Sequence, residues 1–344
     1  MSLPGSVEEK IKMRCDFKGA LLPTVLPPVL LMEIVLGILA NGFALWIFCF
    51  QLKPWKSSTV LLFNLAVADF LLIMALPFRA SYYLSGINWM FGESVCNIIL
   101  FMLAMNRSGS TFFLMAIALD RYMCVVHPHH PINSVSVSKA MLGALILWLV
   151  PVAMTAHVFS LKHVNTTKCE SFVIETETDH SLNWHKTVFL LSFYLPLSMI
   201  IYCTFHIVVQ LRRRRLGQQA KMKRALCFIA VVVILFIVCF LPSNITEVLI
   251  WIKTHQVVHS LPQSEICPAM EEMTNTFFIS ISLTYFNSAM DPLVYYFSIP
   301  AFKNICRKVL FLEPAEPSGS TDKKTKETGS HSRTEGVNMV KACY

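Results

Sequence analysis

The chain has 344 residues, of which 55% are hydrophobic and only 15% are charged, and its mean hydropathy is +0.56. This composition is too apolar for a soluble protein of that length and indicates a membrane protein. The formal net charge is +8, but the sequence has no basic platform interleaved with aromatic residues of the kind that binds nucleic acid. We therefore expect the basic residues to contact anionic membrane lipid and expect no nucleic-acid partner.

Seven apolar segments are long enough to cross a bilayer as helices. A helix rises 1.5 Å per residue, so about 20 residues cover the ~30 Å hydrocarbon layer. The segments lie near residues 26–50, 58–84, 93–126, 137–159, 184–211, 222–252 and 273–297. The sequence therefore predicts an all-α membrane protein that folds as a seven-transmembrane-helix bundle.

Lysine and arginine in the short loops predict the orientation, because they mark the cytoplasmic side. They gather in the turn after the first span, in the loop between the fifth and sixth spans, and after the seventh span. We therefore expect residues 1–25 outside the cell, residues 26–311 as the helical domain, and residues 312–344 as a cytoplasmic tail. This tail is rich in Ser, Thr, Lys and Glu, a composition typical of disorder.

The second span carries an acid and an arginine. Asp69 lies near the middle of the bilayer, where a charge is costly unless it is protonated or holds a cation. Arg79 follows Pro77 near the outer end. It can contact a ligand or extend to the membrane surface, and the sequence leaves both readings open.

The third span carries Arg107, the strongest indication of an interior binding site. A charge near the bilayer centre costs about 2.5–3.5 kcal/mol and needs a partner. Arg107 is eleven residues beyond Cys96, so it lies ~16 Å below the outer rim, deep enough for the floor of a cavity open to the outside. A guanidinium matches a carboxylate with two parallel hydrogen bonds. We expect an acidic ligand there; the alternative is a permanent ion pair with Asp69 or another interior acid.

Four of the eleven cysteines fall on the outer side in this topology: Cys15, Cys96, Cys169 and Cys267. Disulfides are permitted there. One arrangement pairs Cys96 with Cys169 and Cys15 with Cys267, although four cysteines allow three connectivities. The sequence Asn165-Thr166-Thr167 in the second outer loop predicts a glycan on Asn165.

The last spans contain breaks and polar residues. Pro242 removes a hydrogen bond inside the sixth span, so the inner half of this helix can swing. The seventh span carries a polar run that ends in Asp291-Pro292, which indicates internal water or an ion. Residues 302–310 then read as a short amphipathic eighth helix on the inner leaflet, with Cys306 as a palmitoylation site.

Three histidines, His127, His129 and His130, lie where the third span leaves the membrane. No cysteine or acid stands at ligand spacing beside them, so we predict no metal site there. The chain also lacks the internal repeat of many transporters and the motifs of zinc or serine hydrolases, which disfavours a transporter or an intramembrane enzyme.

Each span also carries a short motif, and together these motifs resemble the markers of rhodopsin-like (class A) G-protein-coupled receptors. They are Asn41, the run from Asn64 to Asp69, Cys96, Asp120-Arg121-Tyr122, Trp148, Pro196, Cys239-Phe240-Leu241-Pro242 and Asp291-Pro292-Leu293-Val294-Tyr295. The resemblance implies a receptor in the plasma membrane that is not an enzyme. It implies that G-protein coupling and the conformational switch depend on Asp120, Arg121, Tyr122, Phe240, Pro242, Asp291, Pro292 and Tyr295. It also implies a sodium site at Asp69, Asn106, Ser110 and Asp291, and arrestin and receptor kinases as partners of the tail.

A narrower resemblance points to the ligand. The stretches 55–60, 76–79, 103–107, 127–130, 169–172 and 283–285 are similar to those of the hydroxycarboxylic acid receptors and of the related oxoeicosanoid and hydroxyeicosanoid receptors. That group binds small or oxidised fatty carboxylic acids and signals mainly through inhibitory G proteins, which lower cyclic AMP. Arg107 matches its carboxylate-holding arginine, and Ser171 and Tyr285 match pocket-lining positions. A peptide or another lipid is the alternative ligand.

Two positions depart from the wider family. Phe240 stands where many relatives carry tryptophan, and Met222 stands where an acid often pairs with the arginine matched by Arg121. The restraint on the inactive state is then expected to be weak, with some activity in the absence of ligand.

Overall fold

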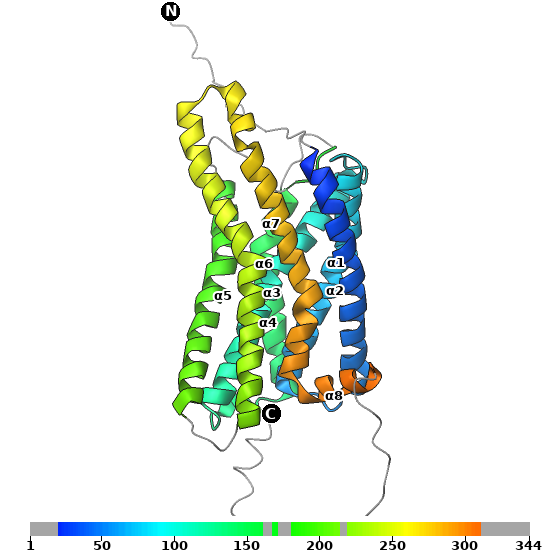
Figure 1. Ribbon diagram of the computed structural model, residues 1–344, viewed down its shortest axis with the longest axis vertical. Helices are drawn as coiled ribbons and strands as arrows, with labels where there is room; N and C mark the ends of the chain where they lie inside the picture. Colours follow the sequence, from blue (N-terminus) through cyan, green and yellow to red (C-terminus); the bar gives the residue numbers. More distant parts are fainter. Residues whose placement is uncertain (1–19, 161–166, 171–179, 214–218, 311–344) are drawn as a thin grey trace, which may run out of the picture.

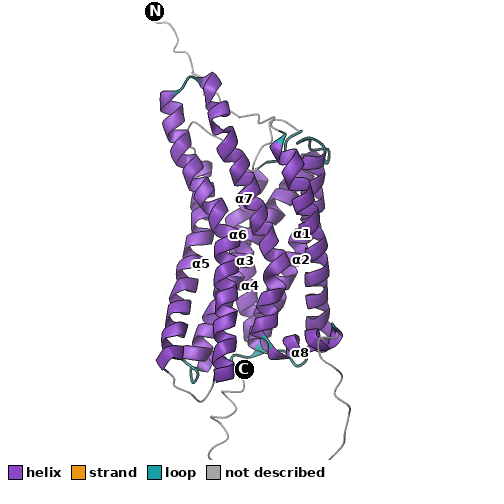
Figure 2. Cartoon of the chain, viewed as in Figure 1, coloured by secondary structure: helices purple, strands orange, loops and turns teal. Residues whose placement is uncertain are grey.

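The computed structural model describes residues 20–160, 167–170, 180–213 and 219–310, which form long helices packed into one bundle (Figure 1). The secondary structure of these residues is helical, with short connecting turns (Figure 2). The helices are α1 Leu21–Trp46, α2 Ser57–Leu84, α3 Gly92–Val126, α4 Val137–Thr155, α5 His180–Arg213, α6 Gln219–Ser260, α7 Gln263–Ser298 and α8 Pro300–Val309. A π-helical turn, Ile47–Gln51, continues α1, and the 3-10 turn Ala156–Ser160 follows α4.

Six of these helices, α1 to α6, are long and apolar enough to cross a membrane. The seventh, α7, has 36 residues, so its length of ~54 Å is also sufficient. Its mean hydropathy is lowered by polar residues, but Asn287, Ser288 and Asp291 are at most 1% exposed and face the bundle. The mean hydropathy of α7 does not distinguish these inward-facing polar residues from residues that would face lipid. The predicted seven-transmembrane-helix bundle with an eighth helix is confirmed.

The outer surface of the bundle is apolar. On α4, Leu142, Leu145, Ile146 and Leu149 are each more than half exposed. Large contiguous apolar patches are rare on soluble proteins, whereas a membrane protein turns such residues to lipid and its polar groups inward. The distribution is that of a multi-pass membrane protein.

Two helices are longer than the sequence predicts. The sixth predicted span ends near 252 and the seventh begins near 273, but α6 continues to Ser260 and α7 begins at Gln263. The two helices rise together beyond the rest of the bundle (Figure 1). The extra turns contain charged and polar residues such as Lys253, His255 and Glu271. The hydropathy of the sequence falls in these turns, so it does not indicate that the two helices continue.

The two ends of the bundle differ. One end, the disulfide end, carries the Cys96–Cys169 disulfide, which was one of the predicted pairings. Cys267 is also disulfide-bonded, and its predicted partner Cys15 lies outside the described residues. The other end, the α8 end, is closed by α8, whose Phe302 packs on Phe48 and Tyr295 with ring centroids 5.5 and 6.0 Å apart.

The interior has two apolar clusters with a polar layer between them. The cluster at the disulfide end includes Leu72, Leu103 and Tyr285, and the cluster at the α8 end includes Leu65, Phe113 and Tyr295. Between them along the helices lie buried polar side chains, which we call the polar layer: Glu33, Asn41, Asp69, Asn106, Ser110, Ser243, Asn244, Glu247, Asn287, Ser288 and Asp291. Buried polar groups inside a membrane are costly and are usually functional.

Candidate functional site

Arg107, on α3, lies beside the polar layer and is half-buried. Its guanidinium carbon is 3.8 Å from the centroid of the Phe189 ring on α5. Its Nη2 is 3.5 Å from Oγ of Ser243 on α6, which is long for a hydrogen bond. No carboxylate of the described residues lies within ion-pair distance of this guanidinium. Arg107 therefore retains donors for an anion.

The ion pair between Arg107 and Asp69, one alternative that the sequence left open, is not formed. Asp69 contacts Ser110 and Tyr295 instead. Tyr285 on α7, a predicted pocket residue, is 8% exposed and interacts electrostatically with both Arg107 and Arg79. The structure thus places these three predicted residues near one another.

Arg79 is 5% exposed and does not extend to the membrane surface. It donates hydrogen bonds to the Cys169 carbonyl at 2.6 Å and to the Tyr83 hydroxyl at 3.0 Å. Its guanidinium also lies 5.1 and 5.0 Å from the ring centroids of Tyr82 and Tyr83. The hydroxyl of Tyr82 donates to Glu170 at 2.8 Å. Arg79 therefore fixes the disulfide-bonded loop to α2, which uses part of its donor capacity.

Two predicted residues of the second outer loop, Ser171 and the glycan acceptor Asn165, lie outside the described residues. Their assignments stay predictions.

Two interior acids were missed by the sequence analysis. Glu33 on α1 is 1% exposed, and both of its carboxylate oxygens lack a hydrogen-bond partner among the described residues. Glu247 on α6 is 2% exposed and attracts Arg107 electrostatically. Both acids lie inside predicted spans, so the rule that singled out Arg107 also applied to them.

The predicted sodium-site residues lie together in the polar layer. Asp69 Oδ1 is 3.5 Å from the Ser110 hydroxyl, and the Asn106 amide donates to the Ala68 carbonyl at 3.0 Å. Asp291 accepts from the Asn287 amide at 2.9 Å and interacts with Asp69 across the helices.

Two buried carboxylates so close repel each other unless one is protonated or a cation lies between them. Asp291 Oδ1 and the Ser288 hydroxyl have no hydrogen-bond partner among the described residues. Carboxylate and hydroxyl oxygens are the ligands that a hard cation prefers, so these residues fit a sodium ion.

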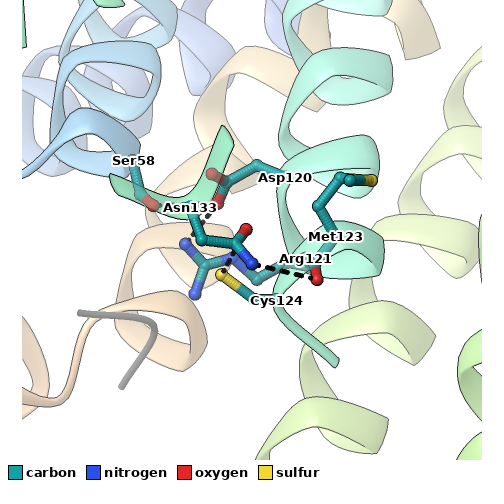
Figure 3. Close-up of polar contacts among 6 residues, drawn as sticks. All are labelled: Ser58, Asp120, Arg121, Met123, Cys124 and Asn133. Carbon is teal, nitrogen blue, oxygen red and sulfur yellow. Dashed lines mark hydrogen bonds and ion pairs between the residues drawn. The ribbon is translucent and has the colours of Figure 1, made fainter. Parts of the chain in front are cut away.

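At the α8 end, Asp120 holds its neighbour Arg121 in an ion pair (Figure 3). The same Asp120 oxygen accepts a hydrogen bond of 2.8 Å from Ser58 on α2. The two side chains are 23% and 16% exposed, so the pair is only partly screened by solvent. Tyr122, the third residue of the motif, has its hydroxyl 3.2 Å from Nε2 of His127.

The turn after α3 is organised by a residue that the sequence analysis did not single out. Asn133, in the 3-10 turn Pro131–Ser134, points back to the end of α3 (Figure 3). Its amide donates to the carbonyls of Met123, His127 and Pro128 at 3.3, 2.8 and 3.2 Å. One side chain therefore ties the end of α3 to the turn that follows it, although the Met123 and His127 carbonyls also accept backbone N–H groups.

The predicted switch residues on α6 lie in the core. Phe240 is 1% exposed, and its ring centroid is 5.2 Å from that of Phe236, which stacks on Phe193 of α5 at 5.5 Å. Beside Pro242, the side chains of Ser243 and Asn244 donate to the Phe240 carbonyl at 3.0 and 2.8 Å. Both bonds lie in the turn of α6 that contains Pro242.

Cys306 on α8 is 6% exposed, and burial raises the pKa of its thiol. Acylation requires the sulfur to be reached, so this placement does not favour the predicted palmitoylation, which stays a prediction.

The chain matches the family model described as 7 transmembrane receptor (rhodopsin family) over residues 40–295. It is 43% identical to hydroxycarboxylic acid receptor 2 of Homo sapiens over 332 residues, which cover 94% of this chain and 89% of that protein. It is 39% identical to oxoeicosanoid receptor 1 of Homo sapiens, with 86% of this chain and 74% of that protein covered. Identity to the human 12-(S)-hydroxy-5,8,10,14-eicosatetraenoic acid receptor is 36%, with 86% and 91% covered.

Proposed function

The chain belongs to the rhodopsin family of seven-transmembrane receptors, and from that premise we propose that it is a receptor for a carboxylic acid, either a small hydroxycarboxylic acid or an oxidised fatty acid. We further propose that it couples mainly to inhibitory G proteins and lowers cyclic AMP. The names of its relatives refer to such acids, which supports the ligand class by analogy.

The observation that carries this proposal is the environment of Arg107. Its guanidinium is held over the Phe189 ring with one long contact to Ser243, and no carboxylate of the described residues pairs with it. An unpaired charge inside a membrane protein is expensive, so an anion that pairs with it gains affinity. A carboxylate fits the planar, forked guanidinium, and Tyr285 adds a hydroxyl nearby.

We propose that the disulfide end faces the outside of the cell and the α8 end faces the cytoplasm. The basic residues Arg212, Lys303 and Arg307 lie at or near the α8 end, which supports this orientation. The tail, residues 312–344, would then lie in the cytoplasm and bind receptor kinases and arrestin. The glycan on Asn165 and a Cys15–Cys267 disulfide would lie outside the cell.

The proposed mechanism links the two ends through the polar layer. Arg107 contacts α6 at Ser243, whose hydroxyl donates to the Phe240 carbonyl, so a ligand on Arg107 would bias the packing of Phe240. The inner half of α6 then moves about Pro242, and Arg121 leaves Asp120 to receive a G protein. Because ligand and G protein stabilise the same state, each raises the affinity of the other. A sodium ion held by Asp69, Ser110 and Asp291 near Asn106 would supply positive charge that stabilises the opposite state.

The test is suppression of cyclic AMP in cells that express the receptor, measured with carboxylic acids from two to twenty carbons and repeated after pertussis toxin. The variants are Arg107→Ala, which removes the guanidinium, and Arg107→Lys, which keeps the charge without the fork. We expect a toxin-sensitive response to acids of one length, lost in Arg107→Ala and weakened in Arg107→Lys.

Surface expression of each variant is the control for folding. An undiminished response of well-expressed Arg107→Ala would defeat the acid site. Silence of the wild-type receptor toward all the acids would point to a peptide or a non-acidic lipid instead.

A further inference from the structure

Two histidines lie near the end of α6, in the extension that rises with α7 beyond the rest of the bundle (Figure 1). His255 and His259 are four residues apart, so their side chains lie on the same face of the helix. Both side chains are exposed. Their ring centroids are 4.7 Å apart, and the ring planes make an angle of 64°. The helix therefore holds two imidazoles side by side, away from the acid site and the polar layer.

The distance between the two rings matches one shared metal ion. Zinc binds an imidazole nitrogen at ~2.1 Å with tetrahedral angles, which places the centroids of two rings on one ion about 5 Å apart. The observed separation of 4.7 Å is close to this value. Exposed side chains rotate readily, so a nitrogen of each ring can turn toward a common point. The helix thus supplies most of the geometry of a two-histidine metal site.

The ring nitrogens are available for such an ion. Within the described part of the chain, neither ring makes a hydrogen bond or an ion pair, and their contact is with each other. A neutral imidazole offers one nitrogen lone pair, and histidine is the commonest metal ligand among the side chains. A metal ion would therefore displace water from the two rings without breaking a described contact.

The charges around the pair favour a cation. The helix α6 ends at Ser260, so both histidines lie near carbonyl groups of the helix end, which carry partial negative charge. The first turn of α7 adds an exposed acid, Glu265. The basic residue Lys253 precedes His255 by two positions, which places it about 200° around the helix, away from that ring.

We propose that His255 and His259 form a binding site for one divalent ion of the zinc class. Imidazole nitrogen suits Zn²⁺, Cu²⁺ and Ni²⁺, whereas Mg²⁺ and Ca²⁺ take oxygen ligands. No third histidine, cysteine or acid of the described residues completes a set of three ligands, so water fills the other positions of the ion. In the orientation proposed above, the site faces the outside of the cell and responds to extracellular zinc.

A bound ion has a consequence for the end of α6, because it connects two successive turns of the helix. These turns directly precede the short connection to α7, which begins at Gln263. The backbone N–H of Leu261 donates to the Val257 carbonyl at 2.9 Å in the turn that contains His259. Helix ends open more easily than helix centres. An ion held by both rings should therefore keep this turn closed and order the last part of α6.

The experiment measures hydrogen exchange of residues 252–261 in the purified full-length receptor, with and without zinc chloride. A local measurement is needed because histidines elsewhere in the chain can also bind zinc. His255→Gln and His259→Gln each remove one ligand at an exposed position. His129→Gln is the matched control, because His129 is an exposed histidine near the α8 end. Magnesium chloride is the control for the charge of the ion.

In the wild-type receptor, zinc at ten times the dissociation constant should slow the exchange of amides that open with this turn about tenfold. Each single variant should lose this protection, since one histidine with water is a much weaker site. His129→Gln should keep it. Copper should act at lower concentrations than zinc, and magnesium should have no effect. The order of these three ions is measured on the wild-type receptor, so it does not depend on the folding of a variant.

Unchanged exchange in the wild-type receptor up to ~1 mM zinc, the weak end of specific binding, would overturn the inference. Protection that persists in both single variants would also overturn it, because the ion would then bind elsewhere. Equal effects of magnesium and zinc would show screening of charge in place of a site. None of these outcomes depends on the acid ligand, so the proposed function and the metal site stand or fall separately.

Discussion

The phenol of Tyr295 on α7 donates a hydrogen bond of 3.1 Å to the carboxylate of Asp69 on α2. The residues are 226 positions apart, and both side chains are 0% exposed. Tyr295 also packs its ring on Phe48, in the π-helical turn that continues α1, with centroids 5.4 Å apart. The contact therefore joins three helices where the polar layer meets the apolar cluster of the α8 end.

Replacement of Tyr295 by phenylalanine should destabilise this state. The ring and its packing remain, but a buried oxygen of Asp69 loses a donor, which typically costs about 1–3 kcal/mol. We expect the melting temperature of the detergent-solubilised receptor to fall by a few degrees. Tyr296→Phe is the control, because the described residues give the Tyr296 hydroxyl no hydrogen bond. Equal melting temperatures for the two variants would contradict the structural role of the bond.

The proposed sodium site predicts an effect of ion identity on signalling. In a GTP-exchange assay, sodium should lower the potency of the activating acid relative to N-methylglucamine at the same ionic strength. Asp69→Asn removes one of the two carboxylates, so a cation is no longer required to separate like charges. We expect this variant to lose the sodium effect. A potency that still depends on sodium in Asp69→Asn would place the ion elsewhere.

Contacts at the α8 end predict activity in the absence of ligand. Ser58 and Arg121 share one oxygen of Asp120. Ser58→Ala removes one hydrogen bond, and Asp120→Asn removes the ion pair as well. Because a hydrogen bond contributes about 0.5–1.5 kcal/mol, ligand-free GTP exchange should rise roughly two- to tenfold in the first variant and further in the second. Ser57→Ala, at the neighbouring position, should behave as wild type. A lower rate in Asp120→Asn than in wild type would show that the pair supports activation.

The number of spans and most of the polar positions inside them could be predicted from the sequence, because hydropathy and interior charge do not depend on how the helices are rotated. Glu33 and Glu247 carry the same signal and were overlooked. The ends of α6 and α7 could not, since a helix that leaves the membrane continues without an apolar signal. The neighbours of Arg107 could not be predicted from the sequence either. Whether it meets Asp69 or Glu247 depends on which faces of α2, α3 and α6 meet, and this is fixed by packing over the whole bundle.

Glu33 predicts a gain in stability on mutation. Its carboxylate is 1% exposed, and the described residues offer it no hydrogen-bond partner. An unsatisfied buried polar group costs about 1–3 kcal/mol, and replacement by an apolar residue of similar size often stabilises. Glu33→Leu should therefore raise the melting temperature by a few degrees, whereas Glu272→Leu at an exposed position should not. A lower melting temperature for Glu33→Leu would show that the acid has a stabilising partner in the membrane.

Asn133 predicts a defect confined to the α8 end. Its amide donates to three carbonyls at the end of α3 and in the turn after it, and Asn133→Asp replaces the donor with an anion that repels them. The turn between α3 and α4 should loosen, which raises hydrogen exchange there and lowers agonist-stimulated GTP exchange. The binding affinity of the acid at the disulfide end should stay unchanged, because no described contact of Asn133 reaches that end. Asn304→Asp, at an exposed position on α8, carries the same change of charge and is the control. If Asn133→Asp retains full GTP exchange together with increased hydrogen exchange in the turn, the order of this turn is not required for coupling.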